Sequence, residues 1–478
     1  MERKIRYLKC RDNPCGCPRT GASPVPTKIL IIFIIFIAIT LQTTSFAHGQ
    51  DITKLGITLP PSLNFATSPN PVGSGARAVG MGGAFISIAD DATAASWNPG
   101  GLIQLEKPEV SVVGAYDFSK QSQDMNDKDA DISNQTLQRY TLNYLSFAYP
   151  FQLFGKNFVA SLNSQRLYDL HGRTKVLSLF KNIDGVQEVH STQEGELRTV
   201  TPALAVQITP KFSLGASFNF WDKNFSNWSQ NVNLNASGFV ASGSKVLPFK
   251  AVGKIKEDYG LNGFNAHIGF LWEINQMFTL GGVVKTPFLA RVKHHHSSLI
   301  VTTITDETGK NNNIKSSRDF KETLKMRFPI SYGLGLATRF SDNFSVAVDV
   351  YRTEWEYFKL SKGTKKGQVV VEGGAPSGKG KDVLSGKAGA TTQARVGGEY
   401  LFIREKFTIP LRSGIFYDPE PAKNNPDDFY GLSLGTGIAW ERIILDIAYT
   451  YRFGKASGKA SEPDIKQHML LTSMIFHF

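Results

Sequence analysis

Six charged residues occupy alternating positions within apolar segments of this chain: Lys285, Asp349, Arg395, Glu399, Arg412 and Asp446. Successive side chains of a β-strand point to opposite faces, so each charge lies on the face opposite its apolar neighbours. Charged groups on an enclosed face make strong charge-assisted hydrogen bonds. We expect one of two roles for this set. Either it forms an internal network that holds the elements together, or Lys285, Arg395 and Arg412 offer cations to the carboxylate of an acidic lipid.

Other reactive side chains give weaker signals. His294, His295 and His296 are adjacent, so their rings point in different directions in a strand or loop, and we expect a solvated loop rather than a metal site. Cys10, Cys15 and Cys17 lack the fourth ligand of a zinc knuckle. No combination of Ser, His and Asp indicates a catalytic centre. The sequence therefore predicts no catalytic residues, no metal and no cofactor, and it disfavours the alternative of a lipase.

The N-terminal segment has the composition of a secretion signal. Residues 29–39 are apolar, Lys28 precedes them, and Ser45-Phe46-Ala47 follows them. A basic flank, about 7–15 apolar residues and small residues before a cleavage point are typical of a signal peptide. We predict a long signal peptide over residues 1–47. It contains all three cysteines, and its removal lowers the formal net charge from +12 to +7, which is too modest to indicate nucleic-acid binding.

From residue 108 onward, apolar residues recur at every second position in segments separated by turns, for example over residues 212–220 and 432–440. We count fourteen such segments, with short turns and long connections in alternation. Outer-membrane barrels have an even number of antiparallel strands, short periplasmic turns and long extracellular loops. The predicted fold is therefore all-β: a transmembrane antiparallel β-barrel of about 14 strands, with both termini on the periplasmic side.

Two further patterns favour a membrane barrel over a soluble β-sandwich or propeller. Trp272, Trp355 and Trp440 stand at predicted strand ends, where aromatic residues meet the membrane interface. The last strand alternates apolar and other residues from Leu470 to Phe478, and in a soluble sheet it would leave an exposed edge. We expect an integral protein of the bacterial outer membrane, in contact with outer-membrane lipid. The strand ending at Phe478 would be recognised by the barrel assembly machinery.

Residues 48–107 differ from the strands that follow them. The glycine-rich run over 73–85 follows no apolar strand, and no Lys-Ser/Thr pair closes it, so it does not fit a phosphate-binding loop. Glycine also lets backbone approach backbone closely, as a segment folded inside a lumen requires. Asn98-Pro99 ends any helix that begins near Ala89. We predict an N-terminal plug, or hatch, over residues 48–107 and the barrel over residues 108–478.

The order GARAVGMGGAFISIADDATAASWNPGGL, followed at once by a first barrel strand, resembles the hatch of FadL-type outer-membrane transporters. The similarity continues through LGLATRFSDNFSVAVDVYRTEWEYF and LRSGIFYDPEPA and covers the whole mature chain. It implies a passive channel for hydrophobic molecules: long-chain fatty acids in FadL-type proteins and aromatic hydrocarbons in TodX-like relatives. It also implies a hatch motif at Asn98, Pro99 and Gly100, where the family has Asn-Pro-Ala, together with Asp90 and Asp91.

The hatch also resembles that of PorV-like proteins, which share the barrel fold. This second resemblance implies another function: an outer-membrane adaptor that presents secreted proteins and transports no lipid.

The long connections offer a place to collect a ligand. We predict an extracellular loop over residues 222–258, which carries Phe225, Trp228, Phe239 and Phe249 among polar neighbours, and residues 299–304 read Leu-Ile-Val-Thr-Thr-Ile. Exposed apolar clusters mark interaction sites. We expect these residues either to capture a hydrophobic small-molecule ligand or to pack against one another as a lid.

Overall fold

The computed structural model describes residues 68, 70, 73–121, 130–132, 135–179, 184–242, 245–362, 369–372, 388–421, 428–455 and 464–478. The predicted signal peptide and the predicted start of the hatch at residue 48 lie outside these ranges. All described residues belong to one compact unit. None of its described helices is long and apolar enough to cross a membrane.

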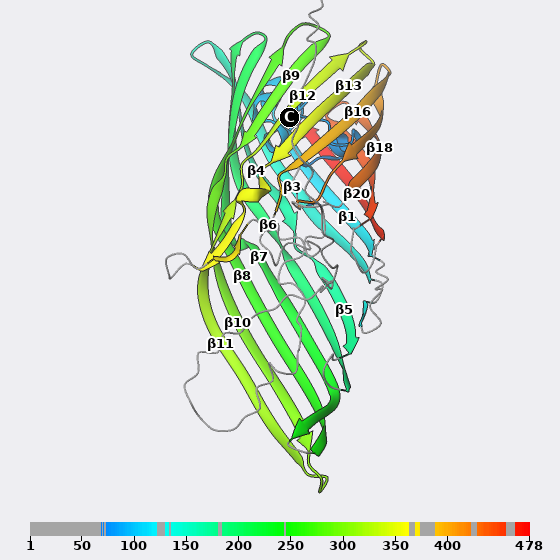
Figure 1. The fold of residues 1–478 in the computed structure, drawn as a ribbon. Coiled ribbons are helices and arrows are strands. Elements are labelled where there is room, and N and C mark those ends of the chain that lie inside the picture. Colours follow the sequence, from blue (N-terminus) through cyan, green and yellow to red (C-terminus); the bar gives the residue numbers. More distant parts are fainter. Residues whose placement is uncertain are drawn as a thin grey trace, which may run out of the picture. The chain divides into compact units, whose positions relative to one another are not determined.

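Fourteen antiparallel strands form a closed ring, in which every strand pairs with two neighbours (Figure 1). In order around the ring, the strands are β1 (Glu109–Gln121), β3 (Gln135–Leu153), β4 (Lys156–Asp169), β6 (Gly185–Thr209), β7 (Phe212–Ser242), β8 (Lys245–Glu273), β9 (Phe278–Lys285), β12 (Ser331–Arg339), β13 (Phe344–Thr353), β16 (Thr391–Ile403), β17 (Phe407–Tyr417), β18 (Phe429–Trp440), β19 (Ile443–Lys455) and β20 (Asp464–His477). The last strand closes the ring on the first, from Glu109 opposite His477 to Gln121 opposite Ile465. The predicted all-β barrel is confirmed.

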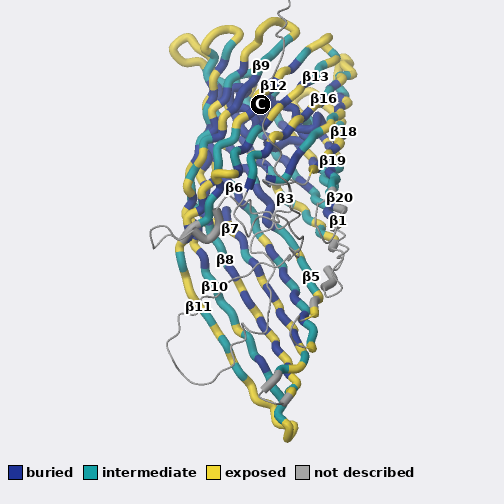
Figure 2. Tube along the Cα trace, viewed as in Figure 1, coloured by how far each residue is buried: buried dark blue, intermediate teal, exposed yellow. Residues whose placement is uncertain are grey.

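The alternation along the strands sets the two faces of the wall. In the ring, exposed and buried residues alternate along the strands (Figure 2). The exposed residues are largely apolar and belong to the outer face, and the buried residues, many of them polar, belong to the inner face. Trp272 and Trp440 are exposed on the outer face, as expected of an aromatic girdle. The prediction for Trp355 was wrong. It lies in the short 3-10 helix η3 (Trp355–Tyr357) and is fully buried, because the chain turns inward after β13 and carries the indole side chain into the protein.

On the side opposite the short turns, several strands continue far beyond the ring. This is the extracellular side in barrels of this kind. We call the extension the extracellular sheet; it consists of β5 (Gly172–Leu179), β10 (Phe288–Thr305), β11 (Asn311–Phe328) and the adjoining parts of β6, β7 and β8. Short strands flank it: β2 (Ala130–Ile132), β14 (Lys359–Lys362) and β15 (Val369–Glu372).

The predicted loop over residues 222–258 was therefore wrong, since these residues lie in β7 and β8 apart from the two undescribed positions 243–244. Their polar content suggested a loop because the outer face of the extracellular sheet is solvated. Asn231, Asn233 and Asn235 alternate there with buried Val232 and Leu234.

Proline interrupts the ladder between β9 and β10 and between β11 and β12, because it has no N–H to donate.

The histidine segment also differs from the prediction, because it lies in β10. His294 is buried on the inner face, with Nε2 2.7 Å from Glu257 Oε2 and Nδ1 3.1 Å from Glu322 Oε1. Its ring stacks on Tyr259, with the ring centres 4.5 Å apart. Burial lowers the pKa of His294, but the hydrogen bonds and charges of Glu257 and Glu322 outweigh burial and raise that pKa above its ordinary value.

This arrangement predicts a pH-dependent extracellular sheet. Because the folded pKa of His294 is raised, its contribution to stability is fully present below the ordinary pKa of about 6.5 and is lost as pH rises through the raised value. Glu257, Glu322, His296 and Tyr259 face it. In hydrogen exchange corrected for intrinsic rates, β10 and β11 should be better protected at about pH 5.5 than at about pH 8.5.

His294→Gln should remove most of this pH dependence, because glutamine carries no titrating charge. His295→Gln is the matched control, since His295 lies on the opposite face of the same strand, near the exposed Asp319. Equal pH dependence in the His294 variant and the wild type would show that His294 does not stabilise the sheet.

Candidate functional site

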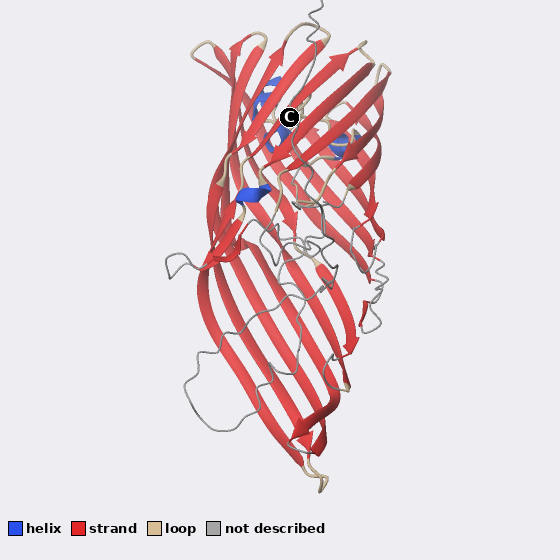
Figure 3. Ribbon diagram, in the orientation of Figure 1, coloured by secondary structure: helices blue, strands red, loops and turns tan. Residues whose placement is uncertain are grey.

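The hatch (residues 73–107 of the described chain) lies inside the ring and carries three short helices (Figure 3). These are α1 (Ala76–Gly80), α2 (Ala94–Trp97) and the 3-10 helix η2 (Pro99–Gln104). Helices of one or two turns are not stable alone, so packing must fix them. Helix α1 contacts β18 and β19, and η2 contacts β6, β7 and β8. The barrel wall therefore determines the structure of the hatch.

Glycines in the wall allow this close packing. A Cβ atom at Gly397 would lie 2.0 Å from the Met81 oxygen, and one at Gly414 would lie 2.3 Å from the Gly82 nitrogen. The hatch turn at Met81 and Gly82 thus rests its backbone directly on β16 and β17. Gly82 itself has a φ of 68°, a left-handed conformation that favours glycine. The close backbone contact expected from the glycine-rich run is present on both partners.

The motif Asn98-Pro99-Gly100 fastens the hatch to β8. Asn98 Nδ2 donates to the backbone oxygens of Ile86 and Phe270, at 2.8 Å each, and Asn98 Oδ1 accepts from the Gly100 nitrogen. Pro99 begins η2, where its missing N–H costs nothing. A Cβ atom at Gly100 would lie 2.8 Å from Phe270 Cα, so glycine fits at this position without displacing β8.

An alternating chain of charges joins the hatch to the wall. Arg77 of α1 contacts Asp90 at 2.6 Å and Glu399 at 3.0 Å. Glu399 also pairs with Arg412, which binds Asp446 at 2.6 Å. Three of the six predicted lumen charges, Glu399, Arg412 and Asp446, therefore belong to a paired network that holds strands and hatch together.

Asp91 is used within the hatch. Its Oδ1 accepts hydrogen bonds from the backbone nitrogen and the hydroxyl of Thr93, at 2.8 Å and 2.5 Å. Asp90 and Asp91 thus orient hatch segments.

Asp349 holds the hatch by its backbone. It is fully buried, and its Oδ2 accepts hydrogen bonds from the Phe85 nitrogen at 2.6 Å and the Ile86 nitrogen at 2.8 Å. Its carboxylate leans over Gly335 of β12, where a Cβ atom would lie 2.2 Å from Oδ1. This carboxylate secures two N–H groups that the short hatch turns leave without a helical partner.

Lys285 and Arg395, which we call the lumen cations, are buried and are not members of that charge chain. Lys285 Nζ lies 5.4 Å from the centre of the Tyr351 ring, and Arg395 Cζ lies 5.0 Å from the centre of the Phe416 ring. Arg395 Nη1 donates to the Gly82 oxygen at 2.9 Å. Its buried Nε has no hydrogen-bond partner among the described residues, and neither does the buried Tyr351 hydroxyl. Arg395 Nε and the Tyr351 hydroxyl can therefore form hydrogen bonds with a ligand.

An aromatic cluster, which we call the mouth cluster, lies where the ring meets the extracellular sheet. Its members are Tyr168, Trp221, Phe288, Phe328, Trp355 and Phe358. The Phe288 and Phe328 rings stack with centres 4.6 Å apart, and Trp221 stacks on Phe288 at 5.4 Å. The indole nitrogens of Trp221 and Trp355 donate to Asn265 and Asn70. The cluster is therefore apolar at its centre and bounded by amides.

Sequence reasoning missed the mouth cluster, although a signal was present. The inward-facing residues of β8 change from polar His267 and Asn265 to apolar Leu261, and β10 continues with inward Ala290 and Val292. An inward face that becomes apolar at one height indicates a packed constriction there, whereas a uniformly polar lumen has none.

The four predicted capture residues do not form one cluster. Trp228 and Phe249 are buried on the inner face of the extracellular sheet, whereas Phe239 is 47% exposed. Phe225 lies in an irregular part of β7, between the pairings of Trp221 and Asn227, and is partly exposed. Residues 299–304 are strand residues of β10. Periodicity of two separates such residues onto opposite faces, which the loop assignment could not anticipate.

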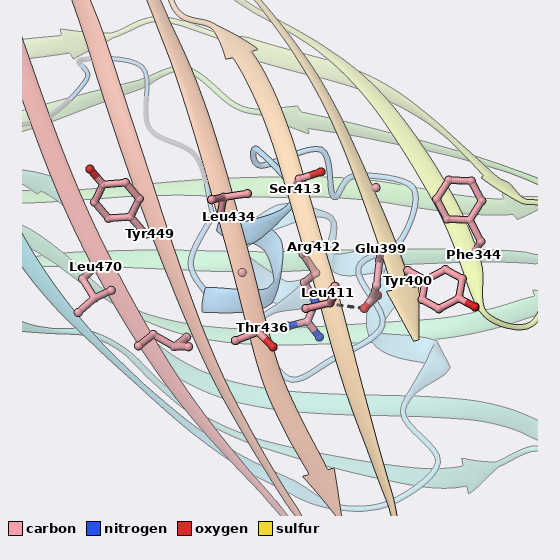
Figure 4. Close-up of a pocket in the computed structure, with 13 residues that line it drawn as sticks. Phe344, Glu399, Tyr400, Leu411, Arg412, Ser413, Leu434, Thr436, Tyr449 and Leu470 are labelled. Atoms are coloured by element: carbon pink, nitrogen blue, oxygen red, sulfur yellow. Dashed lines mark hydrogen bonds and ion pairs between the residues drawn. The ribbon is translucent and has the colours of Figure 1, made fainter. Parts of the chain in front are cut away.

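A groove of about 760 Å³ opens on the lipid-facing side of β16 to β19 (Figure 4). Outward side chains line it, among them Tyr400, Leu411, Leu434 and Tyr449, and the ion pair of Glu399 and Arg412 lies at its base. Strands β17 and β18 pair beneath it, from Leu411 opposite Thr436 to Tyr417 opposite Tyr430. The groove lies on the outer face, whereas the mouth cluster and the lumen cations lie inside the protein and are the candidate site for a transported ligand.

Asp349→Ala should loosen the hatch. It leaves the buried Phe85 and Ile86 nitrogens without an acceptor, which costs about 1–3 kcal/mol for each such group. The folded barrel should unfold at a lower temperature in detergent, and protease should cut the hatch more readily. Asp342→Ala, in an exposed turn, is the control and should change neither property. Unchanged protease resistance of the Asp349 variant would mean that this carboxylate does not anchor the hatch.

Comparisons with known proteins agree with this geometry. Residues 70–474 match the family described as outer membrane protein transport protein (OMPP1/FadL/TodX). No curated protein sequence matches the chain significantly. A FadL homologue of Pseudomonas aeruginosa has a similar structure, with a TM-score of 0.56 at 15% identity over 85% of this chain and 98% of that one.

The monoaromatic hydrocarbon channel CymD gives a TM-score of 0.51 at 15% identity, covering 86% of this chain and 98% of that one. The toluene transporter TbuX of Ralstonia pickettii gives 0.51 at 14% identity, covering 86% and 99%. At such low identity these structures establish the shared fold. The family match spans most of the sequence, and the chain therefore belongs to the OMPP1/FadL/TodX family of outer-membrane transport proteins.

Proposed function

We propose that this protein is a passive channel for the uptake of hydrophobic molecules across the outer membrane, with long-chain fatty acids as its substrates. The observation that carries this proposal is the position of the mouth cluster, between the extracellular sheet and a lumen that holds two buried cations. An aromatic cluster favours an apolar tail, since each Å² of apolar surface removed from water contributes about 25 cal/mol. A buried cation favours a carboxylate.

The inner face of the extracellular sheet would collect the ligand. Val189, Val232, Leu234 and Ile255 form a buried apolar row there, on β6, β7 and β8. The row continues toward the mouth cluster through Trp228, which stacks on Tyr259 with ring centres 4.7 Å apart. The row is buried in this structure, so a hydrocarbon chain would first have to uncover it. Apolar contacts are not directional, so the chain could then move along the row without a large barrier.

Arg395 would link ligand binding to the hatch. Its Nη1 now binds the Gly82 oxygen, while Nε has no partner among the described residues. A fatty-acid carboxylate that took both donors would displace Gly82 and release the hatch turn from β16. Binding energy alone would then shift the hatch toward an open state, with no energy source, no cofactor and no catalytic step.

Aromatic hydrocarbons are the alternative ligand class, because CymD is a monoaromatic hydrocarbon channel and TbuX a toluene transporter. Such molecules would use the mouth cluster but not the lumen cations.

Two further partners belong to this proposal: outer-membrane lipid against the exposed apolar belt, and barrel assembly machinery that recognises the strand ending at Phe478.

Trp221→Ala should weaken ligand binding, because it removes the largest ring of the stack. We expect the affinity of a fluorescent long-chain fatty acid for the purified, folded protein to fall about tenfold, equivalent to about 1.4 kcal/mol. Phe264→Ala on the outer face of β8 is the control and should bind normally. Normal binding by the Trp221 variant would refute a role for the mouth cluster.

Co-purification of secreted proteins in place of lipid would favour the adaptor function.

Arg395→Gln should weaken the binding of fatty acids but not that of fatty alcohols. Hydrogen bonds to charged groups contribute about 1.5–3 kcal/mol, so the affinity for a fatty acid should fall by at least tenfold while that for the alcohol of equal chain length stays constant. Arg412→Gln removes the same charge from the paired network and should leave the acid-to-alcohol ratio unchanged. Equal losses for acid and alcohol in the Arg395 variant would contradict carboxylate recognition at this residue.

A further inference from the structure

The outer face of the extracellular sheet carries a compact group of cations, which we call the rim patch: Arg291, Lys293, Lys325 and Arg327. All four side chains are exposed. Arg291 of β10 lies directly opposite Lys325 of β11. Lys293 and Arg327 are two residues further along their strands and therefore point to the same face.

Positively charged side chains lie close to one another in the rim patch. Like charges directly opposite in an antiparallel pair are destabilising. No ion pair links these four side chains to any residue in the part of the chain that the structure describes. On β8 and β11 the nearest acidic residues of the same face lie further from the ring, where Asp258 pairs with Lys256 at 2.9 Å and Asp319 faces His295. Such repulsion is tolerated if an external anion offsets it.

The position of the rim patch indicates which class of anion would fit it. Leu289 precedes Arg291 by two residues in β10, is 57% exposed and points to the same face. Tyr332 and Leu334 of β12, and Val284 of β9, continue this apolar surface over the ring. The outward face thus changes from apolar to cationic within two residues, at the extracellular edge of the lipid-facing belt. An amphiphile with anionic groups just above its acyl chains has the matching pattern.

We propose that the rim patch binds the phosphorylated headgroup of an outer-leaflet glycolipid, of the lipopolysaccharide type. Its acyl chains would lie on Leu289, Val284 and Leu334 while its phosphates meet the four cations. Arginine suits this role because its planar guanidinium binds phosphate through two parallel hydrogen bonds. The bound lipid would hold the extracellular sheet at a fixed height above the membrane, independently of which ligand the channel carries.

The test uses the full-length folded protein in detergent and two probes, bisphosphorylated lipid A and the same lipid without phosphates. The wild type should bind the phosphorylated form at least tenfold more tightly. Replacement of all four rim residues by Gln should abolish this preference. The matched control replaces Lys250, Lys254, Lys315 and Lys321 by Gln, which removes the same charge from the same face further from the ring, and it should retain the preference.

Three outcomes would overturn the proposal: a preserved preference in the rim variant, an equal loss in the distal control, or full competition by millimolar inorganic phosphate. Arg291→Gln/Lys325→Gln is the second variant. It removes the directly opposed pair of like charges, is expected to fold, and should weaken the preference several-fold. Fatty-acid binding should be normal in every rim variant, so failure of the channel function and failure of this proposal are distinguishable.

Discussion

The backbone hydrogen bonds of the closed ring constrain everything else in this structure. Within a membrane every N–H and C=O must find a partner inside the protein, and a sheet can meet that condition only if its last strand pairs with its first. Strand β20 does so along the whole of β1. Closure fixes which residues face lipid and which face the lumen, because the side-chain period of two then holds around the entire wall. The lumen of a fourteen-stranded ring needs filling, and the hatch fills it.

The hatch depends on the wall more than on its own sequence propensity. Its helices are too short to persist alone, and three kinds of contact hold them: backbone on wall glycines at Gly397 and Gly414, the Asp349 carboxylate on two backbone nitrogens, and the charge chain that begins at Arg77. These contacts differ in how a ligand could act on them. The glycine contacts and the charge chain are complete in themselves. Arg395 combines a hatch contact with a donor, Nε, that has no partner among the described residues, so a carboxylate that bound there would act on the plug. Asp349 also has an unpartnered oxygen, Oδ1, but an acceptor does not attract a carboxylate.

The sequence predicted the ring well, because alternation such as that of residues 212–220 is imposed directly by lipid on one face. Strand parity assigned Lys285, Asp349, Arg395, Glu399, Arg412 and Asp446 to the inner face, and the structure buries all six side chains. It could not predict which of these charges pair, because pairing depends on the height of each residue on neighbouring strands. The extracellular sheet was mistaken for loops because its asparagine-rich outer face has the composition of a loop. The mouth cluster was missed because its members come from β4, β7, β10, β11 and the η3 region, which only the register brings together.

The path of the ligand is the central claim, and photolabelling tests it most directly. A long-chain fatty acid with a diazirine at its terminal carbon can be bound to the folded protein, irradiated and located by mass spectrometry. The proposed route predicts labels on peptides that contain Trp221, Phe288 and Phe328, and competition by unlabelled fatty acid. Labels confined to the lipid-facing groove around Leu434 and Tyr449, without competition, would contradict it.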